Sequence, residues 1–237
     1  MSYQYLIISY QYLMLLLLIL KVILAEDTTK SSNSITSTND NYNKLSRHPS
    51  KTFQIKTSGS CGTSLTFSVQ NDKLIIEGSG YMKSYDSKTP APWSSDKDII
   101  QTIELPVELT SIGSYAFSGL SNLKNITIPA KVTSIGSSAF MKCTSLQTIK
   151  IPLQVTSLKL SLFYGCTNLL TVEYHENINS MGGEIFYECS NLQEFTLPTK
   201  VTSISMYTFF RCTNLKLTIH NLVTSISWNA FVGCHMI

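Results

Sequence analysis

The sequence predicts a β-rich solenoid of about six 23-residue coils with a small β N-terminal cap. A phenylalanine recurs at Phe117, Phe140, Phe163, Phe186, Phe209 and Phe231, at intervals of 23, 23, 23, 23 and 22 residues. Apolar and polar residues keep the same phases within each interval. Five of the six cysteines also share one phase, three residues after each phenylalanine from Phe140 onward. A fixed period in this range is typical of a solenoid, in which stacked repeats share one core.

The N-terminal region, residues 1–25, is strongly apolar and predicts a signal peptide or a signal anchor. Its unbroken aliphatic stretch, Leu13–Leu20, has the length of the central region of a signal peptide, and Ala25 is a candidate cleavage site. Against cleavage, no Lys or Arg precedes the stretch and Lys21 interrupts its end, so an uncleaved membrane anchor stays open as the alternative. The signal peptide is the favoured interpretation. Either one places the rest of the chain at the cell surface or in secreted form.

Residues 26–57 are dominated by Ser, Thr, Asn and Lys, with few large apolar residues. A segment of this composition cannot bury enough surface to fold alone, so we expect a flexible stalk.

Residues 58–100 predict the N-terminal β cap. Apolar and polar residues alternate from Leu65 to Val69, which indicates a half-buried strand; Asn71-Asp72 indicates a turn, and Leu74–Glu77 a second strand. The first coil of a solenoid has an open apolar face, which a dissimilar cap has to cover. We expect the cap to pack through three aromatic residues, namely Trp93, Tyr81 and Tyr85. A carbohydrate-stacking role for these aromatics is the alternative.

Residues 101–237 carry the repeat. Each unit begins with alternating apolar residues such as Ile126 and Ile128, which predict a strand, and a proline or histidine follows it. The phrase V-T-S-I comes next and either turns a corner or forms a second short strand. Each unit then buries its phenylalanine and, usually, a cysteine. Because Leu120 occupies the cysteine phase in the first unit, we expect buried free thiols rather than disulfides.

Composition and motifs give no sign of catalysis, metal or cofactor binding. Charged residues make up 14% of the chain and the net charge is +3, which does not suggest a nucleic-acid partner. We find no Cys-x-x-Cys pair, nucleophile elbow or phosphate loop. The four histidines are His48, His175, His220 and His235. His175 and His220 share a phase, and neither has a Cys or acidic partner that recurs beside it. We therefore predict a protein that is not an enzyme, with no metal and no cofactor.

The repeat pattern SxxAFxxCxxLxxIxIPxxVTSIG, read in cyclic order, resembles the BspA-like leucine-rich repeats, also called the treponemal type. The resemblance covers residues 101–234, and the preceding CGTSLTFSV and PWSS stretches are similar to the amino-terminal region of such proteins. It implies a right-handed leucine-rich repeat array. It also implies a surface antigen or adhesin, of the kind found on bacteria and protozoan parasites, which binds host proteins or other cells.

The outward positions of the predicted strands form the candidate binding face. These residues are Glu104, Asn125, Thr127, Thr148, Lys150, Thr171, Glu173, Glu194, Thr196 and Thr218. The face is rich in Thr and poor in charge, which suits hydrogen-bonded contact with a protein or a glycan. Asn125-Ile-Thr127 is the only N-glycosylation sequence of the chain, and a glycan on Asn125 would obstruct this face.

The last coil is expected to expose Val223, Ile226, Phe231 and part of Cys234, because no further strand follows in the sequence. This predicts homo-association through the C-terminal coil, or a truncated member of the family. Our leading hypothesis is a non-enzymatic adhesin or surface antigen whose partner is a host or matrix protein or another cell-surface molecule. The alternatives are a self-assembling surface scaffold and a truncated member without binding activity.

Overall fold

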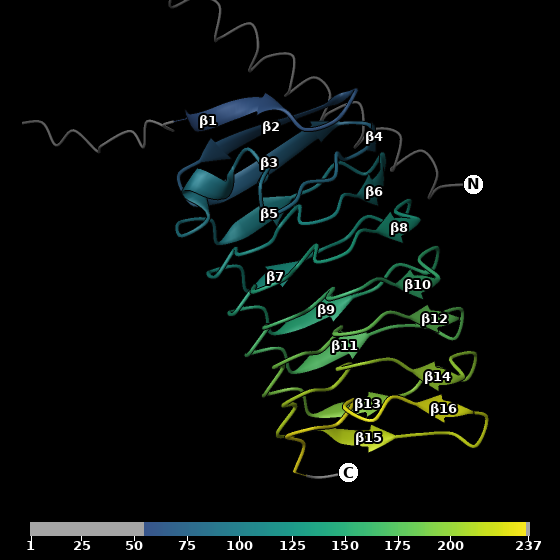
Figure 1. The fold of residues 1–237 in the computed structure, drawn as a ribbon. Helices are drawn as coiled ribbons and strands as arrows, with labels where there is room; N and C mark the ends of the chain where they lie inside the picture. Colours follow the sequence, from purple (N-terminus) through teal and green to yellow (C-terminus); the bar gives the residue numbers. More distant parts are fainter. Residues whose placement is uncertain (1–54, 236–237) are drawn as a thin grey trace, which may run out of the picture. The chain divides into compact units, whose positions relative to one another are not determined.

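The computed structural model describes residues 55–235, with side chains from Thr57 onward (Figure 1). The predicted signal peptide or anchor and nearly all of the predicted stalk lie outside the described residues. Within 55–235, no helix is both long and apolar enough to cross a membrane.

The cap is an antiparallel sheet that runs directly into the first coil. β1 (Ile55–Ser60), β2 (Leu65–Gln70) and β3 (Lys73–Gly78) pair antiparallel, and β3 pairs in parallel with β5 (Thr102–Glu104). β2 and β3 lie where the alternation predicted them, and Asn71 in the turn between them has a φ of 56°. β1 was not predicted, because the sequence IKTSGS shows no apolar alternation. The rest of the cap contains β4 (Gly80–Tyr81) and the short 3₁₀ helix η1 (Ser94–Asp96).

The aromatic residues of the cap differ in their roles. Trp93 is 1% exposed, and its Nε1 donates a hydrogen bond to the carbonyl of Ala116 at 2.9 Å. Tyr85 is half-buried against Trp93. The prediction that Tyr81 packs in the cap is wrong, because its side chain is 58% exposed. Successive side chains of a strand point to opposite sides, and here Met82 takes the inward position, at 3% exposure.

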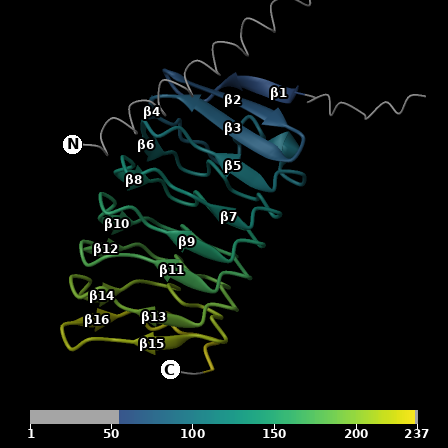
Figure 2. The same ribbon diagram turned by 180° about the vertical axis from the view of Figure 1, so that it is seen from behind.

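The repeat region forms the predicted β-solenoid, with two strands in each of six coils and five full turns between the first coil and the last. Figures 1 and 2 show the strands stacked in two columns. The first column holds β5, β7 (Asn125–Ile126), β9 (Thr148–Lys150), β11 (Thr171–Glu173), β13 (Glu194–Thr196) and β15 (Lys216–Thr218). The second holds β6 (Leu109–Ile112), β8 (Ser134–Ile135), β10 (Ser157–Leu158), β12 (Ser180–Met181), β14 (Ser203–Ile204) and β16 (Ser225–Ile226).

Parallel pairing joins neighbouring coils one period apart. Asn125 lies opposite Thr148, and Thr148 lies opposite Thr171, so each step is 23 residues. Glu194 lies opposite Lys216, a step of 22 residues that absorbs the single deletion. The phrase V-T-S-I supplies a second short strand rather than only a corner: its last two residues are strand in coils two to six, and all four residues of the corresponding phrase are strand in the first coil.

The core is a continuous column of phenylalanines. From Phe117 to Phe209 the rings are fully buried, and successive ring centroids down to Phe231 lie 5.5–5.9 Å apart. Trp93 extends this column into the cap, since its ring lies 6.1 Å from that of Phe117. The cap and the coils therefore share one core.

The five cysteines of the repeats, Cys143 to Cys234, form a second column in the core, and Cys61 lies in the cap. All six are free; five are buried and Cys234 is partly exposed, as the sequence predicted. Each thiol of the column also donates to the carbonyl of a phenylalanine, for example Cys166 Sγ to Phe140 O at 3.0 Å and Cys189 Sγ to Phe163 O at 3.1 Å. Burial raises the pKa of Cys166 to about 12, so the thiol stays protonated at neutral pH.

The glycine in the phrase V-T-S-I-G allows two coils to approach closely. A Cβ on Gly136 would lie 2.3 Å from the backbone nitrogen of Ser114 in the preceding coil. A side chain on residue 136 would therefore require this backbone to shift, although Lys159 and Ser205 occupy the same phase in other coils.

Candidate functional site

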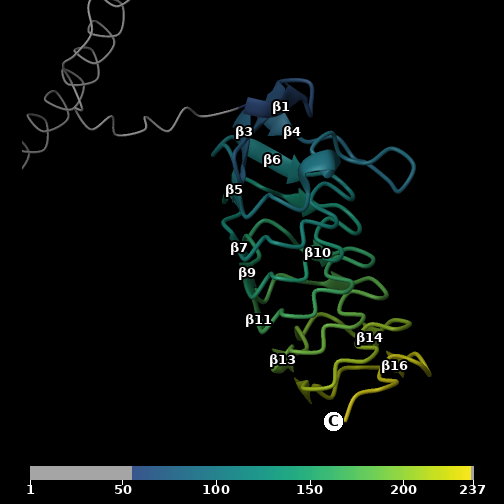
Figure 3. The same ribbon diagram turned by 90° about the vertical axis from the view of Figure 1, so that its left-hand side faces the viewer.

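The predicted binding face exists as an exposed surface along the first strand column, which we call the ladder face. All ten predicted residues are exposed, while the residues between them in the strands are buried or partly buried. The side view in Figure 3 shows β5, β7, β9, β11 and β13 along one edge of the solenoid, with the long loops on the other side. Strand alternation thus exposes the ten residues along one column, and partner binding by this face stays a prediction.

Strand pairing divides the ladder face into three parts. Asn125, Thr148 and Thr171 follow one another across the three-stranded sheet β11-β9-β7. Glu194 and Thr196 on β13, with Thr218 on β15, belong to a separate two-stranded sheet. Glu104 belongs to the cap sheet. The largest continuous part is therefore the one formed by coils two to four.

Ion pairs on the ladder face are exposed and weak. Lys150 Nζ lies 3.4 Å from a carboxylate oxygen of Glu173, with side chains 81% and 65% exposed. Lys73 and Glu104 form a second pair at 2.5 Å. Exposed pairs of this kind contribute about 0–1 kcal/mol, so a partner could separate them at little cost.

Two exposed residues of this face were missed from the sequence. Thr102 precedes Asn125 by one full period, so its phase was readable. Lys216 lies opposite Glu194, but the one-residue deletion in its coil obscured its position.

A groove of about 640 Å³ opens beside the ladder face where the strands of coils two to four end. Its floor and walls are largely apolar. Thr127, Lys150 and Glu173 of the ladder face line it together with Ile126, Ile128, Ala130, Ile151, Pro152, Leu153, Gln154, Tyr174 and His175. Leu153 is 67% exposed, so its apolar side chain is available to a partner. The arrangement can accept an apolar side chain while offering hydroxyl and charged groups at its rim.

The fourth-coil wall of the groove is fixed by hydrogen bonds between coils. The Tyr174 hydroxyl donates to the carbonyl of Thr196 in the next coil, and its ring lies 5.0 Å from that of Phe195. His175 Nε2 bonds to the carbonyl of Pro152 at 2.8 Å, and its Nδ1 accepts the N–H of Asn177 at 3.2 Å. Because Nδ1 accepts, the ring proton lies on Nε2, and this histidine is a structural link between coils.

Two of the other histidines, His220 and His235, lie within the described residues. His220 repeats the arrangement of His175, with Nε2 3.0 Å from the carbonyl of Pro198. His235 is exposed on the last coil, and His48 lies outside the described residues. Across residues 55–235, no three His, Cys, Asp or Glu side chains are grouped so that they could hold a metal ion.

The last coil carries several exposed apolar side chains. Ile226 is 49% exposed, while Val223, Phe231 and Cys234 are partly exposed. Trp228, at 87%, is more exposed than any of them and was not singled out from the sequence. Self-association through this coil stays a prediction.

Comparison with known proteins identifies the repeat. A family model described as the BspA type leucine rich repeat region matches six copies over residues 95–216. A search of curated proteins finds no match to the chain.

Two solved structures of bacterial leucine-rich repeat proteins are similar to this chain. One, from T. pallidum, is 25% identical with a TM-score of 0.58, over 69% of this chain and 82% of that one. Another, from Eubacterium ventriosum ATCC 27560, is 21% identical with a TM-score of 0.54, over 76% of this chain. The match spans 64% of the Eubacterium protein, less than two thirds of its length.

Proposed function

The chain belongs to the BspA-type leucine-rich repeat family, and we propose that it is a non-enzymatic surface or secreted protein that binds a protein partner, as an adhesin does. The binding site in this proposal is the ladder face of coils two to four together with the groove beside it. One observation carries it: Thr127, Lys150 and Glu173 belong to both surfaces, so the two are continuous.

The groove supplies affinity in this proposal. Burying one aliphatic or aromatic side chain of a partner contributes about 1.5–3 kcal/mol. Leu153 is exposed at the wall of the groove, and a bound partner would also bury its side chain. Apolar residues buried near the centre of an interface carry most of its binding energy.

The ladder face supplies specificity. Its threonines and Asn125 both donate and accept hydrogen bonds, and Lys150 and Glu173 place opposite charges 3.4 Å apart at the groove rim. Such a surface fits an extended protein segment with polar groups on either side of one apolar residue. Solenoids of this kind are typically binding scaffolds, whose extended surfaces contact partners.

The surface or secreted location rests on the sequence of residues 1–25. Their aliphatic stretch and candidate cleavage site support export. A host or matrix protein, or another cell-surface molecule, is the class of partner that fits this location.

We predict that Leu153→Asp weakens adhesion at least tenfold. The full chain is immobilised, and retention of matrix proteins and of cells is compared between wild type and variant. A buried carboxylate without a partner opposes binding, so we expect at least a tenfold loss. Met206→Asp is the matched control, because Met206 is 52% exposed and lies outside the groove and the ladder face. Equal loss in both variants, or none in Leu153→Asp, would contradict the proposed site.

A further inference from the structure

A second hollow lies on the loop side of the solenoid, separate from the ladder face. It has a volume of about 490 Å³ and is formed by the cap loop 86–94 and by the turns of the first two coils. Figure 3 shows this loop, in blue-teal, projecting on the side away from β5, β7 and β9. None of the residues that line it belongs to the ladder face or its groove.

The walls of this hollow are held in place before any ligand arrives. Both backbone N–H groups of Lys88 and Thr89 donate to Asp86 Oδ1, each at 2.7 Å, which ties the loop into a turn. Behind the loop, Trp93 is fixed by its bond to Ala116 and by its packing on Phe67, with ring centroids 5.2 Å apart. A site that is already organised loses little entropy when a ligand binds.

Two lysines line the hollow and have no internal counter-ion. Lys97 and Lys142 are both exposed, and neither forms an ion pair with a residue that the structure describes. They sit two coils apart, with Gly119 of the intervening coil between them. Lys97 Cδ lies 3.7 Å from where a Cβ on Gly119 would be.

Gly119 keeps the space between the two lysines open, because it has no side chain to fill it. The lysine backbones are separated by two strand spacings, roughly 10 Å. Each side chain has to cover only about half of that distance. The Lys142 side chain now lies toward Gly165 of the next coil, with Cγ 3.3 Å from where a Cβ on Gly165 would be. Rotation about its side-chain bonds brings its ammonium group over Gly119, where it and Lys97 can bind one anionic group.

The other polar groups of the hollow suit a sugar rather than a polyanion. Ser87, Ser94, Ser118 and Tyr115 provide hydroxyl groups that donate and accept hydrogen bonds. The loop N–H groups of Lys88 and Thr89 bond to Asp86 Oδ1, and Asp86 Oδ2 can also accept from a ligand hydroxyl. The carboxylate of Asp86 would repel a chain of many phosphates or sulfates, but it tolerates one acidic group bound by two lysines.

We propose that this hollow binds an acidic saccharide, whose carboxylate or sulfate group lies between Lys97 and Lys142 while its hydroxyl groups bond to Asp86 and to the serines. This site is independent of the adhesive surface proposed above. A protein could therefore occupy the ladder face while a glycan occupies the loop side.

The test is calorimetric titration of the full chain with three sugars. 3′-Sialyllactose carries a carboxylate, lactose 3′-sulfate carries a sulfate, and lactose carries neither. We expect saturable binding of one or both acidic sugars, at least tenfold tighter than lactose and weaker at higher salt. Binding of only one of them supports the site and identifies its acid group. Lys97→Ser and Lys142→Ser should each weaken binding at least fivefold, and the double variant should abolish it.

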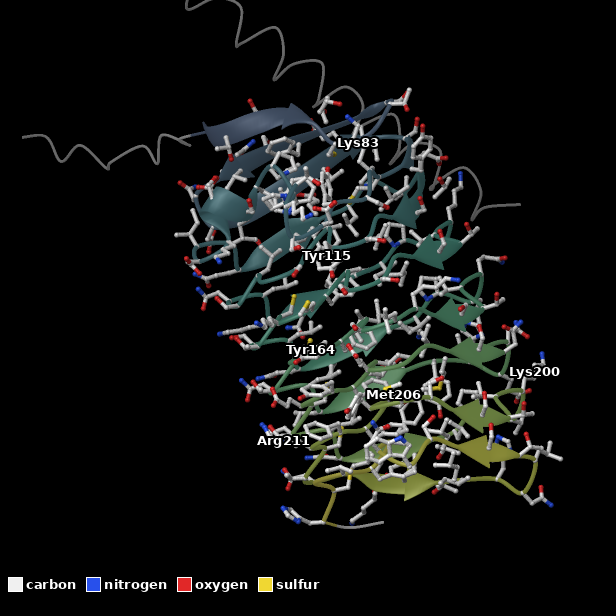
Figure 4. All side chains as sticks on the ribbon, in the orientation of Figure 1. Lys83, Tyr115, Tyr164, Lys200, Met206 and Arg211 are labelled. Atoms are coloured by element: carbon white, nitrogen blue, oxygen red, sulfur yellow. The ribbon has the colours of Figure 1, made fainter. Side chains whose placement is uncertain are left out.

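Lys200→Ser is the control, because Lys200 is exposed on the fifth coil, well below Tyr115 in Figure 4. It should bind like wild type, and all variants should keep the wild-type melting temperature. The proposal is overturned if no sugar binds, if lactose binds as tightly as the acidic sugars, or if the double lysine variant still binds. If inorganic sulfate bound with the same affinity as the acidic sugars, the sugar part would contribute nothing and the ligand would not be a saccharide. None of these results depends on adhesion through the ladder face.

Discussion

Replacing Phe163 by alanine should lower the free energy of unfolding by about 3–5 kcal/mol. Phe163 is fully buried at the middle of the phenylalanine column, with ring centroids 5.9 Å from Phe140 and 5.8 Å from Phe186. Its removal leaves a cavity and takes away a stacking partner from both neighbours. In a solenoid each coil contacts only the next ones, so the loss falls on two interfaces at once. Urea unfolding followed by circular dichroism measures the change.

Leu153→Ala is the control for this experiment, because Leu153 is 67% exposed and its loss should change stability by less than about 0.5 kcal/mol. Phe163→Leu should fall between the two, since leucine refills part of the cavity. If Phe163→Ala cost less than about 1 kcal/mol, the phenylalanines could not be the shared core of the coils.

Stability should fall steeply as the pH rises above 9. Burial raises the pKa of Cys166 from 9.0 to about 12, and it raises the pKa values of Cys143 and Cys189 well above 9.0. Cys212, also buried, shifts in the same direction. In the unfolded chain the thiols ionise from about pH 9, while in the folded chain they stay protonated. The contribution of the protonated thiols to the free energy of unfolding is therefore fully present below pH 9 and is lost progressively above it. At pH 10 the loss is about 1.4 kcal/mol for each thiol, or about 5–6 kcal/mol for the four.

The contribution of one thiol can be isolated by difference. Cys166→Ala should be less stable than wild type at pH 8, because it loses the bond from Sγ to the carbonyl of Phe140. Between pH 8 and pH 10 the free energy of unfolding of the variant should then fall by about 1.4 kcal/mol less than that of wild type, because every other titrating group is the same in both. Identical pH dependence in the two proteins would show that these thiols are not protected by burial.

The period of the sequence was enough to predict the solenoid, because each phase has a single environment in every coil. Ile126 and Ile149 are buried for the same reason that Asn125 and Thr148 are exposed: neighbouring strands pair one period apart. The ladder face followed directly from this alternation. The sequence also predicted the buried cysteine column, because one coil carries Leu120 in its place.

The groove could not be predicted, because it depends on contacts between coils rather than on phase. Tyr174 occupies the phase of Ile128 and Ile151, yet its hydroxyl bonds to the backbone of the following coil. The period shows which residues occupy equivalent positions in the coils. It does not show which neighbouring coil each of these side chains contacts. The cap shows the same limit, since Tyr81 and Met82 are both large and apolar and only strand pairing decides which one is buried.

The most direct test of the adhesive role uses a glycan to cover the ladder face. Asn125 is exposed on this face and starts the only N-glycosylation sequence of the chain, so production in a eukaryotic secretion host can place one glycan there. Adhesion of the same preparation is then measured before and after enzymatic removal of the glycan. We predict no adhesion while the glycan is present and full adhesion once it is removed. Equal adhesion in both states would contradict binding through the ladder face.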